Sequence, residues 1–460
     1  MRPGKIGSIK KHEKCRRNIN MAEIRPFRAL RFTDAAGRLQ ELTCPPYDII
    51  SESQRLSYLK RNPHNIIRLE LPRDGEDPYA AAGNVLGEWL RDGILRKDDQ
   101  PALYIYEIEF DLEGRSDIST ADSGRRSVAG LIAQVHLEEF SKGIVLPHEE
   151  TLSKAKTDRL NLMKATGCNF SDIYALYMDD GGESETLDIL ALAAREQPIS
   201  ELTDEAGLTH RLWAITDEGI IQAICRRFAD TKLYIADGHH RYETAINYRN
   251  WLREQGVPVG ADSDYVMMML VEMSHPGLVV FPTHRLVRGI PDFDPDKLLA
   301  DCAGYFDVQP GLAVDSLDES LEHAYQERRK AFGFYTGGDT FTLLTLRDPS
   351  VMSEALPGLS AASQGLDVNV LHTLILERLM GIDKANMANQ TNLTYTRSLR
   401  EALDDVNAGA YQCAFILNPT RVEEIRDVAA AGEKMPQKST YFYPKLITGL
   451  TMNQIHELND

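Results

Sequence analysis

The stretch Tyr234-Ile-Ala-Asp-Gly-His-His-Arg-Tyr-Glu243 decides the fold around it. The preceding Lys232–Ala236 is short, apolar and rich in β-formers, which predicts a buried strand. Gly238 favours a tight turn after Asp237, and the spacing from His240 to Glu254 predicts a helix. The segment therefore predicts a strand, a tight turn and a helix N-terminus in direct succession.

This junction carries several kinds of functional group. Free amides at a helix N-terminus bind anions, and Gly238 lets an anion approach the backbone closely. Arg241 offers a planar fork for phosphate or carboxylate, and His239 or His240 can donate to phosphate or move a proton. Asp237 is a candidate to cap the helix, hold Mg²⁺ or act as a base. The alternative is a plain turn with partly buried histidines. A metal held by both histidines is disfavoured, because helix neighbours point about 100° apart.

Outward from the junction, helices and strands mix without a regular βαβ rhythm. Leu103–Phe110 and Val128–Val135 predict a hairpin, and Tyr265–Met273 predicts an apolar strand. Helical spacing marks Tyr79–Leu90 and Lys154–Ala165. This order favours an α+β fold, with mixed sheets and flanking helices, over a doubly wound sheet.

The length of 460 residues predicts two or three domains. We expect a basic N-terminal tail over residues 1–23, an N-terminal α+β domain over 24–145, a central domain with the junction over 146–290 and a C-terminal α+β domain over 291–460. Met21 is an alternative start to Met1.

Acidic residues outnumber basic ones, with Asp and Glu at 69 against Lys and Arg at 51, a net charge of −18. A field of this sign repels a nucleic-acid backbone, so nucleic acid is a disfavoured partner. The sequence has no run of about 20 apolar residues that predicts a membrane span, and no secretory signal. The six cysteines are scattered without a C-x-x-C pair, which favours reduced thiols in the cytoplasm.

A second polar segment, Leu146-Pro-His-Glu-Glu-Thr151, lies between a predicted strand and a predicted helix. His148, Lys156 and Arg159 are candidates for a cationic wall around a phosphorylated ligand, with Glu149 as proton acceptor. An ordinary charged first helical turn is the alternative.

Three further segments have the same character. Thr283, His284 and Arg285 follow a predicted strand, and Asp48 lies in the constrained turn Cys44–Asp48. Met435–Lys445 predicts an anion or nucleotide pocket with rings for stacking, or a surface turn followed by a core strand. Its candidate ligand-binding residues are Lys438, Ser439, Thr440 and Lys445.

These segments share one pattern, because His, Lys or Arg stands beside a Pro or Gly turn in each. We expect them to form one pocket for an anionic small molecule. The motifs G-x-x-x-x-G-K-[ST], G-x-G-x-x-G, G-x-S-x-G and H-E-x-x-H do not occur, which excludes the common nucleotide and hydrolase signatures.

Six motifs, in order along the chain, resemble the bacterial and archaeal family named domain of unknown function 1015. They are R-P-F-R-A-L-R-F (Arg25–Phe32), C-P-P-Y-D (Cys44–Asp48), L-P-H-E-E-T (Leu146–Thr151), I-A-D-G-H-H-R-Y-E-T-A (Ile235–Ala245), P-T-H-R (Pro282–Arg285) and M-P-Q-K-S-T-Y-F-Y-P-K-L (Met435–Leu446). The resemblance covers essentially the whole chain from about Ile24 and implies a soluble, cytoplasmic protein, often encoded beside serine-biosynthesis genes.

The D-G-H-H-R segment is similar to the phosphate-binding motif of the ParB/sulfiredoxin-like superfamily, which includes nucleotide-dependent free-serine kinases. By motif position, the resemblance implies that Gly238–Arg241 hold phosphate. It supplies no match for the base, for which Glu149 and Asp48 are candidates.

We therefore predict a phosphoryl-transfer enzyme acting on a small polar metabolite, serine or a related hydroxy amino acid, with a nucleotide (ATP or ADP) and Mg²⁺. One alternative is a phosphatase acting on phosphoserine or a similar phosphometabolite. Another is a non-enzymatic ligand-sensing or nucleic-acid-associated protein.

Overall fold

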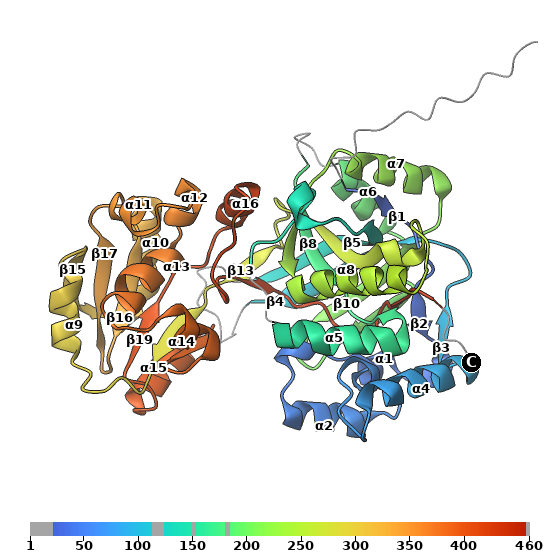
Figure 1. Cartoon of the computed structure of the whole chain (residues 1–460), viewed down its shortest axis with the longest axis horizontal. Coiled ribbons are helices and arrows are strands. Elements are labelled where there is room, and N and C mark those ends of the chain that lie inside the picture. The colour runs from blue at the N-terminus through green and yellow to red at the C-terminus, as the bar shows by residue number, and fades with distance from the viewer. Residues whose placement is uncertain (1–21, 113–123, 150–152, 180–184, 457–460) are drawn as a thin grey trace, which may run out of the picture.

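The computed structural model describes residues 22–112, 124–149, 153–179 and 185–456. These form a larger lobe from the N-terminal and central parts of the chain together with its last residues, and a smaller lobe from most of the C-terminal third, side by side in Figure 1. Outside the described residues lie the predicted tail up to Met21, the tip of the predicted hairpin, and Glu150 and Thr151 of the second polar segment.

The larger lobe is built on a mixed sheet of nine described strands. Its spatial order is β6 (Val145–Leu146), β11 (Leu233–Asp237), β8 (Ile173–Tyr177), β12 (Tyr265–Glu272), β5 (Arg125–His136), β4 (Leu103–Asp111), β10 (Thr209–Ile215) and β9 (Ser200–Thr203), with β1 (Ile24–Arg25) also paired with β5. β4 and β5 form the predicted antiparallel hairpin. β11 runs parallel to β6 and antiparallel to β8, so parallel and antiparallel pairing mix around the junction.

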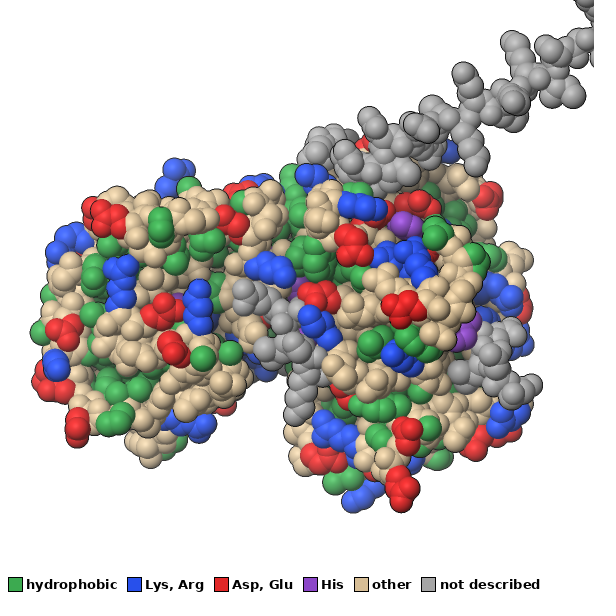
Figure 2. Space-filling model, viewed as in Figure 1, with side chains coloured by type: hydrophobic (Ala, Val, Ile, Leu, Met, Phe, Trp, Pro, Cys, Tyr) green, Lys and Arg blue, Asp and Glu red, His purple; other side chains and the backbone are tan. Residues whose placement is uncertain are grey.

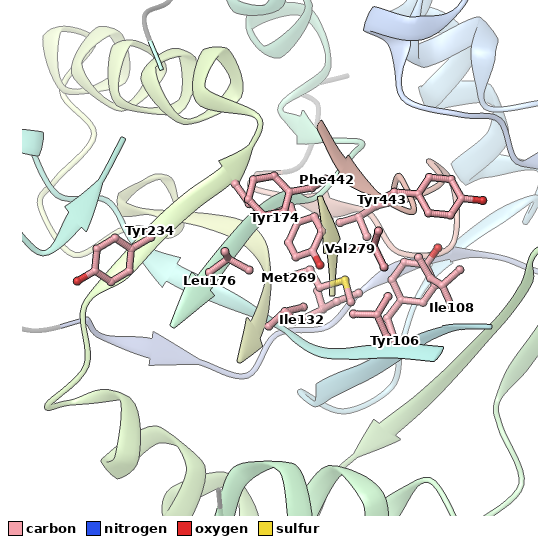
Figure 3. Packing of buried hydrophobic residues seen from close by; sticks show 14 of the residues in the cluster. Tyr106, Ile108, Ile132, Tyr174, Leu176, Tyr234, Met269, Val279, Phe442 and Tyr443 are labelled. Carbon is pink, nitrogen blue, oxygen red and sulfur yellow. The ribbon is translucent and has the colours of Figure 1, made fainter. Parts of the chain in front are cut away.

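β12 shows that this sheet is buried on both faces. Met267 and Met269 belong to one apolar cluster, whereas Met268 and Leu270 belong to another on the opposite face. A strand covered on both faces has a nearly continuous apolar sequence. Figure 3 shows the first cluster, where side chains of β4, β5, β8, β11 and β12 meet.

Helices cover the larger lobe (Figure 1). They are α1 (Leu39–Leu42), α2 (Glu52–Arg61), α3 (Ile67–Glu70), α4 (Pro78–Arg91), α5 (Ser153–Thr166), α6 (Glu185–Ala193), α7 (Glu218–Phe228) and α8 (His239–Glu254), with 3₁₀ turns η1 (Asp34–Ala36), η2 (Tyr47–Ile49), η3 (Phe140–Lys142) and η4 (Asp262–Asp264). α5 packs against α8 and α4. A Cβ at Gly83 would lie 2.6 Å from the carbonyl oxygen of Ala165, so glycine permits the close approach of α4 to α5. Two short strand pairs, β2 (Leu30–Phe32) with β3 (Leu95–Lys97) and β7 (Cys168–Asn169) with β21 (Asn453–Gln454), complete the lobe.

A two-stranded ribbon connects the lobes, formed by β13 (Val279–Phe281) and the antiparallel β20 (Tyr441–Tyr443). Phe442 is buried, and its ring centroid lies 6.0 Å from that of Tyr174 on β8. Figure 3 shows Phe442, Tyr443 and Val279 against the large sheet. The ribbon therefore fixes the segment around residue 440 against the strands next to the predicted junction.

The smaller lobe contains an antiparallel sheet of six described strands. Their spatial order is β15 (Phe306–Ala313), β17 (Thr340–Leu346), β16 (Ala331–Tyr335), β19 (Cys413–Ile416), β14 (His284–Val287) and β18 (Leu393–Thr396). The helical elements here are α9 (Pro295–Cys302), η5 (Val314–Ser316), α10 (Leu317–Gln326), α11 (Val351–Ala355), α12 (Ala361–Gln364), α13 (Asp367–Val370), the π-helical η6 (Leu371–Glu377), α14 (Lys384–Asn389), α15 (Leu399–Asn407) and α16 (Val422–Ala430). Apolar clusters on both faces of the sheet form the core of this lobe.

The architecture confirms the predicted α+β class with mixed sheets and flanking helices. The nine-stranded sheet takes strands from both sides of the predicted boundary at residues 145/146, and the division into three domains stays a prediction. No helix within the described ranges is long and apolar enough to cross a bilayer.

Candidate functional site

A cleft of about 380 Å³ lies between the lobes, and segments far apart in the sequence line it. The larger lobe contributes the η2 turn, Glu149 and the junction between β11 and α8, and the smaller lobe contributes residues next to β14 and β18. The lining residues are Tyr47, Asp48, Ile49, Glu149, Ala236, Asp237, Gly238, His239, His240, Arg241, Thr283, Gln390, Tyr395, Thr396, Arg397, Lys438, Thr440, Tyr441 and Lys445. The structure thus brings residues from every predicted segment to one cleft. Their roles stay predictions.

The junction has the predicted geometry. β11 ends at Asp237, Gly238 is the N-cap residue with a φ of +93°, and α8 begins at His239. No side chain caps this helix. Its first backbone hydrogen bond runs from the N–H of Tyr242 to the carbonyl of Gly238 at 3.0 Å, which leaves the preceding amides of the first turn to other acceptors. Amides in this position bind anions.

Asp237 lies at the centre of an ion-pair cluster. Lys445 Nζ is 2.5 Å from its Oδ1, and Arg241 Nη2 is 2.5 Å from its Oδ2. Burial alone would raise the pKa of Asp237, but Lys445 and Arg241 outweigh burial and hold that pKa well below its usual value. Asp237 is therefore a permanent anion at neutral pH, with a cation at each oxygen.

This pairing bears on the roles considered for Asp237. A carboxylate held ionised by two cations is a weak proton acceptor. Both of its oxygens are engaged, so the arrangement does not fit Asp237 to a Mg²⁺ ion. The described part of the chain contains no group of three or more His, Cys, Asp or Glu side chains placed to hold a metal ion. The structure instead favours Asp237 as the residue that fixes Lys445 and Arg241 in place.

Two buried histidines lie at the cleft, where His239 belongs to the lining and His148 stands behind it. His148 Nδ1 donates to the carbonyl of Ile235 at 2.6 Å, which leaves Nε2 to accept from Thr440 Oγ1 at 3.0 Å. His239 Nε2 accepts the backbone N–H of His148 at 3.2 Å. Burial lowers the pKa of His148 to about 4, and burial with the neighbouring His148 lowers that of His239 well below its ordinary value. Both rings are neutral at pH 7, and these hydrogen bonds fix their tautomers.

We expect the burial of His148 to make the protein sensitive to mild acid. Its folded-state pKa of about 4 lies below the unfolded value of about 6.5, so the unfolded chain takes up the proton first. Stability from this group is complete above pH 6.5 and is lost as pH falls toward 4, by about 2 kcal/mol between pH 6.5 and pH 5. Urea unfolding at several pH values measures this slope. His148→Gln should reduce this slope by an amount equal to the uptake of about one proton on unfolding. His323→Gln, at a residue 71% exposed, should leave the slope unchanged. An unchanged slope in His148→Gln would contradict the assignment.

Glu149 is the cleft carboxyl with the environment of a proton acceptor. Its Oε1 accepts the backbone N–H of Lys438 at 3.0 Å. Burial raises its pKa above the ordinary value, and the N–H and ammonium of Lys438 offset only part of that effect. Asp48 lies in the η2 turn, is exposed, and lines the same cleft. The two base candidates therefore lie in one cleft, Glu149 partly buried and Asp48 exposed to solvent.

The side chains of Lys156 and Arg159 contact residues outside the cleft. Lys156 Nζ pairs with Glu243 at 2.6 Å. Arg159 is buried, donates to the carbonyl of Glu70 at 2.6 Å, and lies over the ring of Tyr47 at 4.2 Å from its centroid. Neither side chain lines the cleft. Arg159 supports the η2 turn from behind, because Tyr47 belongs to that turn.

The later segments divide in the same way. Thr283 lines the cleft, but His284 and Arg285 are each 1% exposed at the start of β14 and do not. Lys438 and Thr440 line it, whereas Ser439 turns inward and donates to the carbonyl of Pro436 at 2.5 Å. The strand predicted to end at Phe281 is followed at once by β14, which buries the side chains that were expected at a strand end.

Sequence reasoning missed several residues of the lining. These are Tyr47, Ile49, Ala236, Gln390, Tyr395, Thr396, Arg397 and Tyr441. Tyr47 and Tyr441 belong to quoted motifs, so the signal was present for them. The 390–397 segment has no Gly or Pro turn, and only the pairing of β18 with β14 brings it beside Thr283.

Gly238→Ala is expected to destabilise the protein and to weaken anion binding. Alanine at a φ of +93° is strained by about 1–2 kcal/mol, and its Cβ would lie 2.8 Å from Arg241 Nε. Gly256→Ala is the matched control, because Gly256 has a φ of +91° but no atom within 4 Å of the added Cβ. Thermal melts with and without phosphate should show a larger loss in the Gly238 variant, and a phosphate effect lost only there. Equal losses in both variants would contradict the close contact.

Several solved structures are similar to this chain. A free serine kinase in complex with AMP is 13% identical with a TM-score of 0.33, over 70% of this chain and 92% of that one. A conserved hypothetical protein from Pyrococcus furiosus is 13% identical with a TM-score of 0.33, over 70% and 95%. SbnI with a C-terminal truncation from Staphylococcus aureus is 11% identical with a TM-score of 0.32, over 72% and 90%. The comparison with curated proteins gave no match.

The family comparison covers five of the six motifs, and the sixth, Met435–Leu446, lies beyond the matched residues. The sequence model described as "Protein of unknown function (DUF1015)" matches residues 24–369, three quarters of the chain. The match includes the η2 turn, Glu149 and the junction between β11 and α8. This chain belongs to the DUF1015 family.

Proposed function

We propose that the cleft binds a small phosphorylated ligand and that the protein transfers a phosphoryl group from a nucleotide, ATP or ADP, to the hydroxyl of a small polar metabolite. One observation carries the proposal. The glycine-started N-terminus of α8 and a partly buried carboxyl with a raised pKa, Glu149, line the same cleft. The first can hold a phosphoryl group, and the second can take the proton of an attacking hydroxyl.

The chemistry of the residues that line the cleft suggests a role for each of them. The amides of His239–Arg241 hold phosphoryl oxygens, with Lys445 and Lys438 as nearby positive charge. Glu149 accepts the proton as the hydroxyl oxygen bonds to phosphorus and the bond from phosphorus to the nucleotide oxygen breaks. Arg241 acts from behind, because its guanidinium is bound to Asp237 and to the carbonyl of Asp172.

Mg²⁺, where a nucleotide brings it, would neutralise charge on the phosphates. Asp48 is the exposed carboxylate of the cleft and is our candidate for holding the ion, since Asp237 is occupied by Lys445 and Arg241. Serine or a related hydroxy amino acid is the acceptor that the resemblance of the D-G-H-H-R segment suggests.

The test is a direct assay of the purified protein. One arm contains serine, Mg²⁺ and either ATP or ADP, and the other contains phosphoserine alone, each followed by ³¹P NMR. Phosphoserine formed in the first arm supports the proposal. Inorganic phosphate released only in the second arm would replace it with a phosphatase. No change in either arm, together with no shift in melting temperature by nucleotide, would overturn both activities.

A further inference from the structure

The positive charges of the cleft are distributed unevenly between its two sides. On the side of α8 they already have acidic partners, because Lys445 and Arg241 bind Asp237, and nearby Lys156 binds Glu243. On the side of the smaller lobe, two arginines have no acidic partner among the residues that the structure describes. A bound anion should therefore gain more binding free energy on the side of the smaller lobe, because its charge meets arginines that no carboxylate of the described residues neutralises.

Arg397 is the first of these arginines. It follows β18, lines the cleft and is exposed. Its Cζ lies 3.9 Å from the ring centroid of Tyr441, and no hydrogen bond or ion pair links its guanidinium to another described residue. A cation–π contact holds a guanidinium in place without using its N–H donors as hydrogen-bond donors to an oxygen acceptor. Arg397 is thus held in position with a free bidentate fork.

Tyr441 connects this fork to the junction at α8. Lys445 lies over the same ring, 4.5 Å from its centroid, and Lys445 Nζ is 2.5 Å from Asp237. The ring of Phe281 stacks on Tyr441 with centroids 6.4 Å apart, so the ribbon between the lobes holds the arrangement. One aromatic side chain therefore places a free cation and the phosphate-side lysine close enough for a single small molecule to reach both.

Arg285 is the second arginine and lies behind the same side of the cleft. It is 1% exposed and donates to the carbonyls of Thr283 and Lys438 and to His372 Nε2, but no carboxylate of the described residues pairs with it. Its Cζ lies 5.3 Å from the ring centroid of Tyr395, which lines the cleft. A buried charge without a counter-ion is costly, and an anion bound in front of Tyr395 would offset that cost.

We propose that the smaller-lobe side of the cleft binds a carboxylate through Arg397, so that the ligand is an acid with a phosphoryl group at the other end. The unphosphorylated substrate would then be a hydroxy acid or hydroxy amino acid. This inference rests on the proposed function of the same cleft and narrows its substrate class. The positive charge of Arg285 supports the carboxylate without touching it.

Phosphoserine and phosphoethanolamine test the inference, because they differ only by one carboxylate. Isothermal titration of the full chain with each ligand should give at least ~10-fold tighter binding of phosphoserine. In Arg397→Gln that preference should disappear, while the affinity for phosphoethanolamine stays the same. Arg400→Gln is the matched control, since Arg400 is 75% exposed on α15 and should leave both affinities unchanged.

The outcomes separate the two proposals. Equal binding of both ligands by the unmodified protein, or a preference that survives in Arg397→Gln, would overturn the carboxylate site and leave the phosphate site standing. Failure of both ligands, of inorganic phosphate and of ATP to bind would overturn the proposed function and this inference together. Melting curves of each variant check that loss of binding is not loss of fold.

Discussion

Lys445→Met is expected to lower the free energy of unfolding by about 3 kcal/mol at pH 7, the cost of removing one of the two cations that pair with the largely buried Asp237. Lys445 Nζ lies 2.5 Å from Asp237 Oδ1, and the two side chains are 12% and 18% exposed. The variant would leave Arg241 as the remaining cation at Asp237. Urea unfolding at constant pH measures the loss.

Two comparisons isolate the pair. In Asp237→Asn/Lys445→Met the unpaired carboxylate is absent, so the double variant should lose clearly less than the sum of the single variants, with a coupling energy of at least ~1 kcal/mol. Lys142→Met is the matched surface control. Lys142 pairs with Glu138 at 2.6 Å but is 56% exposed, and we expect a loss under about 1 kcal/mol. Additive losses in the double variant would show that the pair does not stabilise the fold.

The pH dependence of this loss has a definite sign. Lys445 helps to hold the pKa of Asp237 below its unfolded value of about 3.9. The stability that the pair supplies is therefore present above pH 4 and lost as pH falls through the folded-state pKa. The difference between the unmodified protein and Lys445→Met should shrink below pH 4. A constant difference from pH 7 down into that range would contradict the ion pair as its origin.

Local patterns were sufficient to predict the junction of β11 and α8 at one side of the cleft. A short apolar strand, a glycine and a helical spacing are encoded within 232–254, and the structure has β11, a left-handed Gly238 and α8 in that order. The hairpin of β4 and β5 was predictable for the same reason, since both segments are rich in β-formers and are neighbours in sequence. Contacts between neighbours in sequence need no knowledge of the tertiary fold.

The smaller-lobe side depends on long-range pairing, which a single sequence does not reveal. Arg397 faces the cleft because β18 pairs with β14, more than a hundred residues earlier, and because Tyr441 holds its guanidinium. Arg285 was predicted as an anion ligand, yet β14 buries it behind Tyr395. The net charge of the sequence likewise gives no information on where the unpaired cations lie. On the face seen in Figure 2, Lys and Arg lie interspersed with Asp and Glu, so the net charge of −18 does not indicate where cations lack partners.

Glu149→Gln is expected to reduce the rate of phosphoryl transfer by about 10²–10⁴-fold while leaving ligand affinity nearly unchanged. Glutamine has the same shape, and its Oε1 can still accept the N–H of Lys438, so the turn around residue 438 is retained. It cannot take up the proton of the attacking hydroxyl. Steady-state kinetics and titration with a non-reacting ligand separate the two effects, and Glu139→Gln, at an exposed carboxylate paired with Arg249, is the control.

The pH profile distinguishes Glu149 from Asp48 as the acceptor. Burial raises the pKa of Glu149, so activity should fall with acidification at a pH above the ordinary glutamate range, as the carboxylate becomes protonated. That acid limb should be absent from the residual activity of Glu149→Gln. In Asp48→Asn it should persist, with a weakened dependence on Mg²⁺ if Asp48 holds the ion. If Glu149→Gln keeps full activity and Asp48→Asn removes it together with the acid limb, the proton acceptor is the exposed carboxylate of the η2 turn, and Glu149 serves only to hold the Lys438 turn.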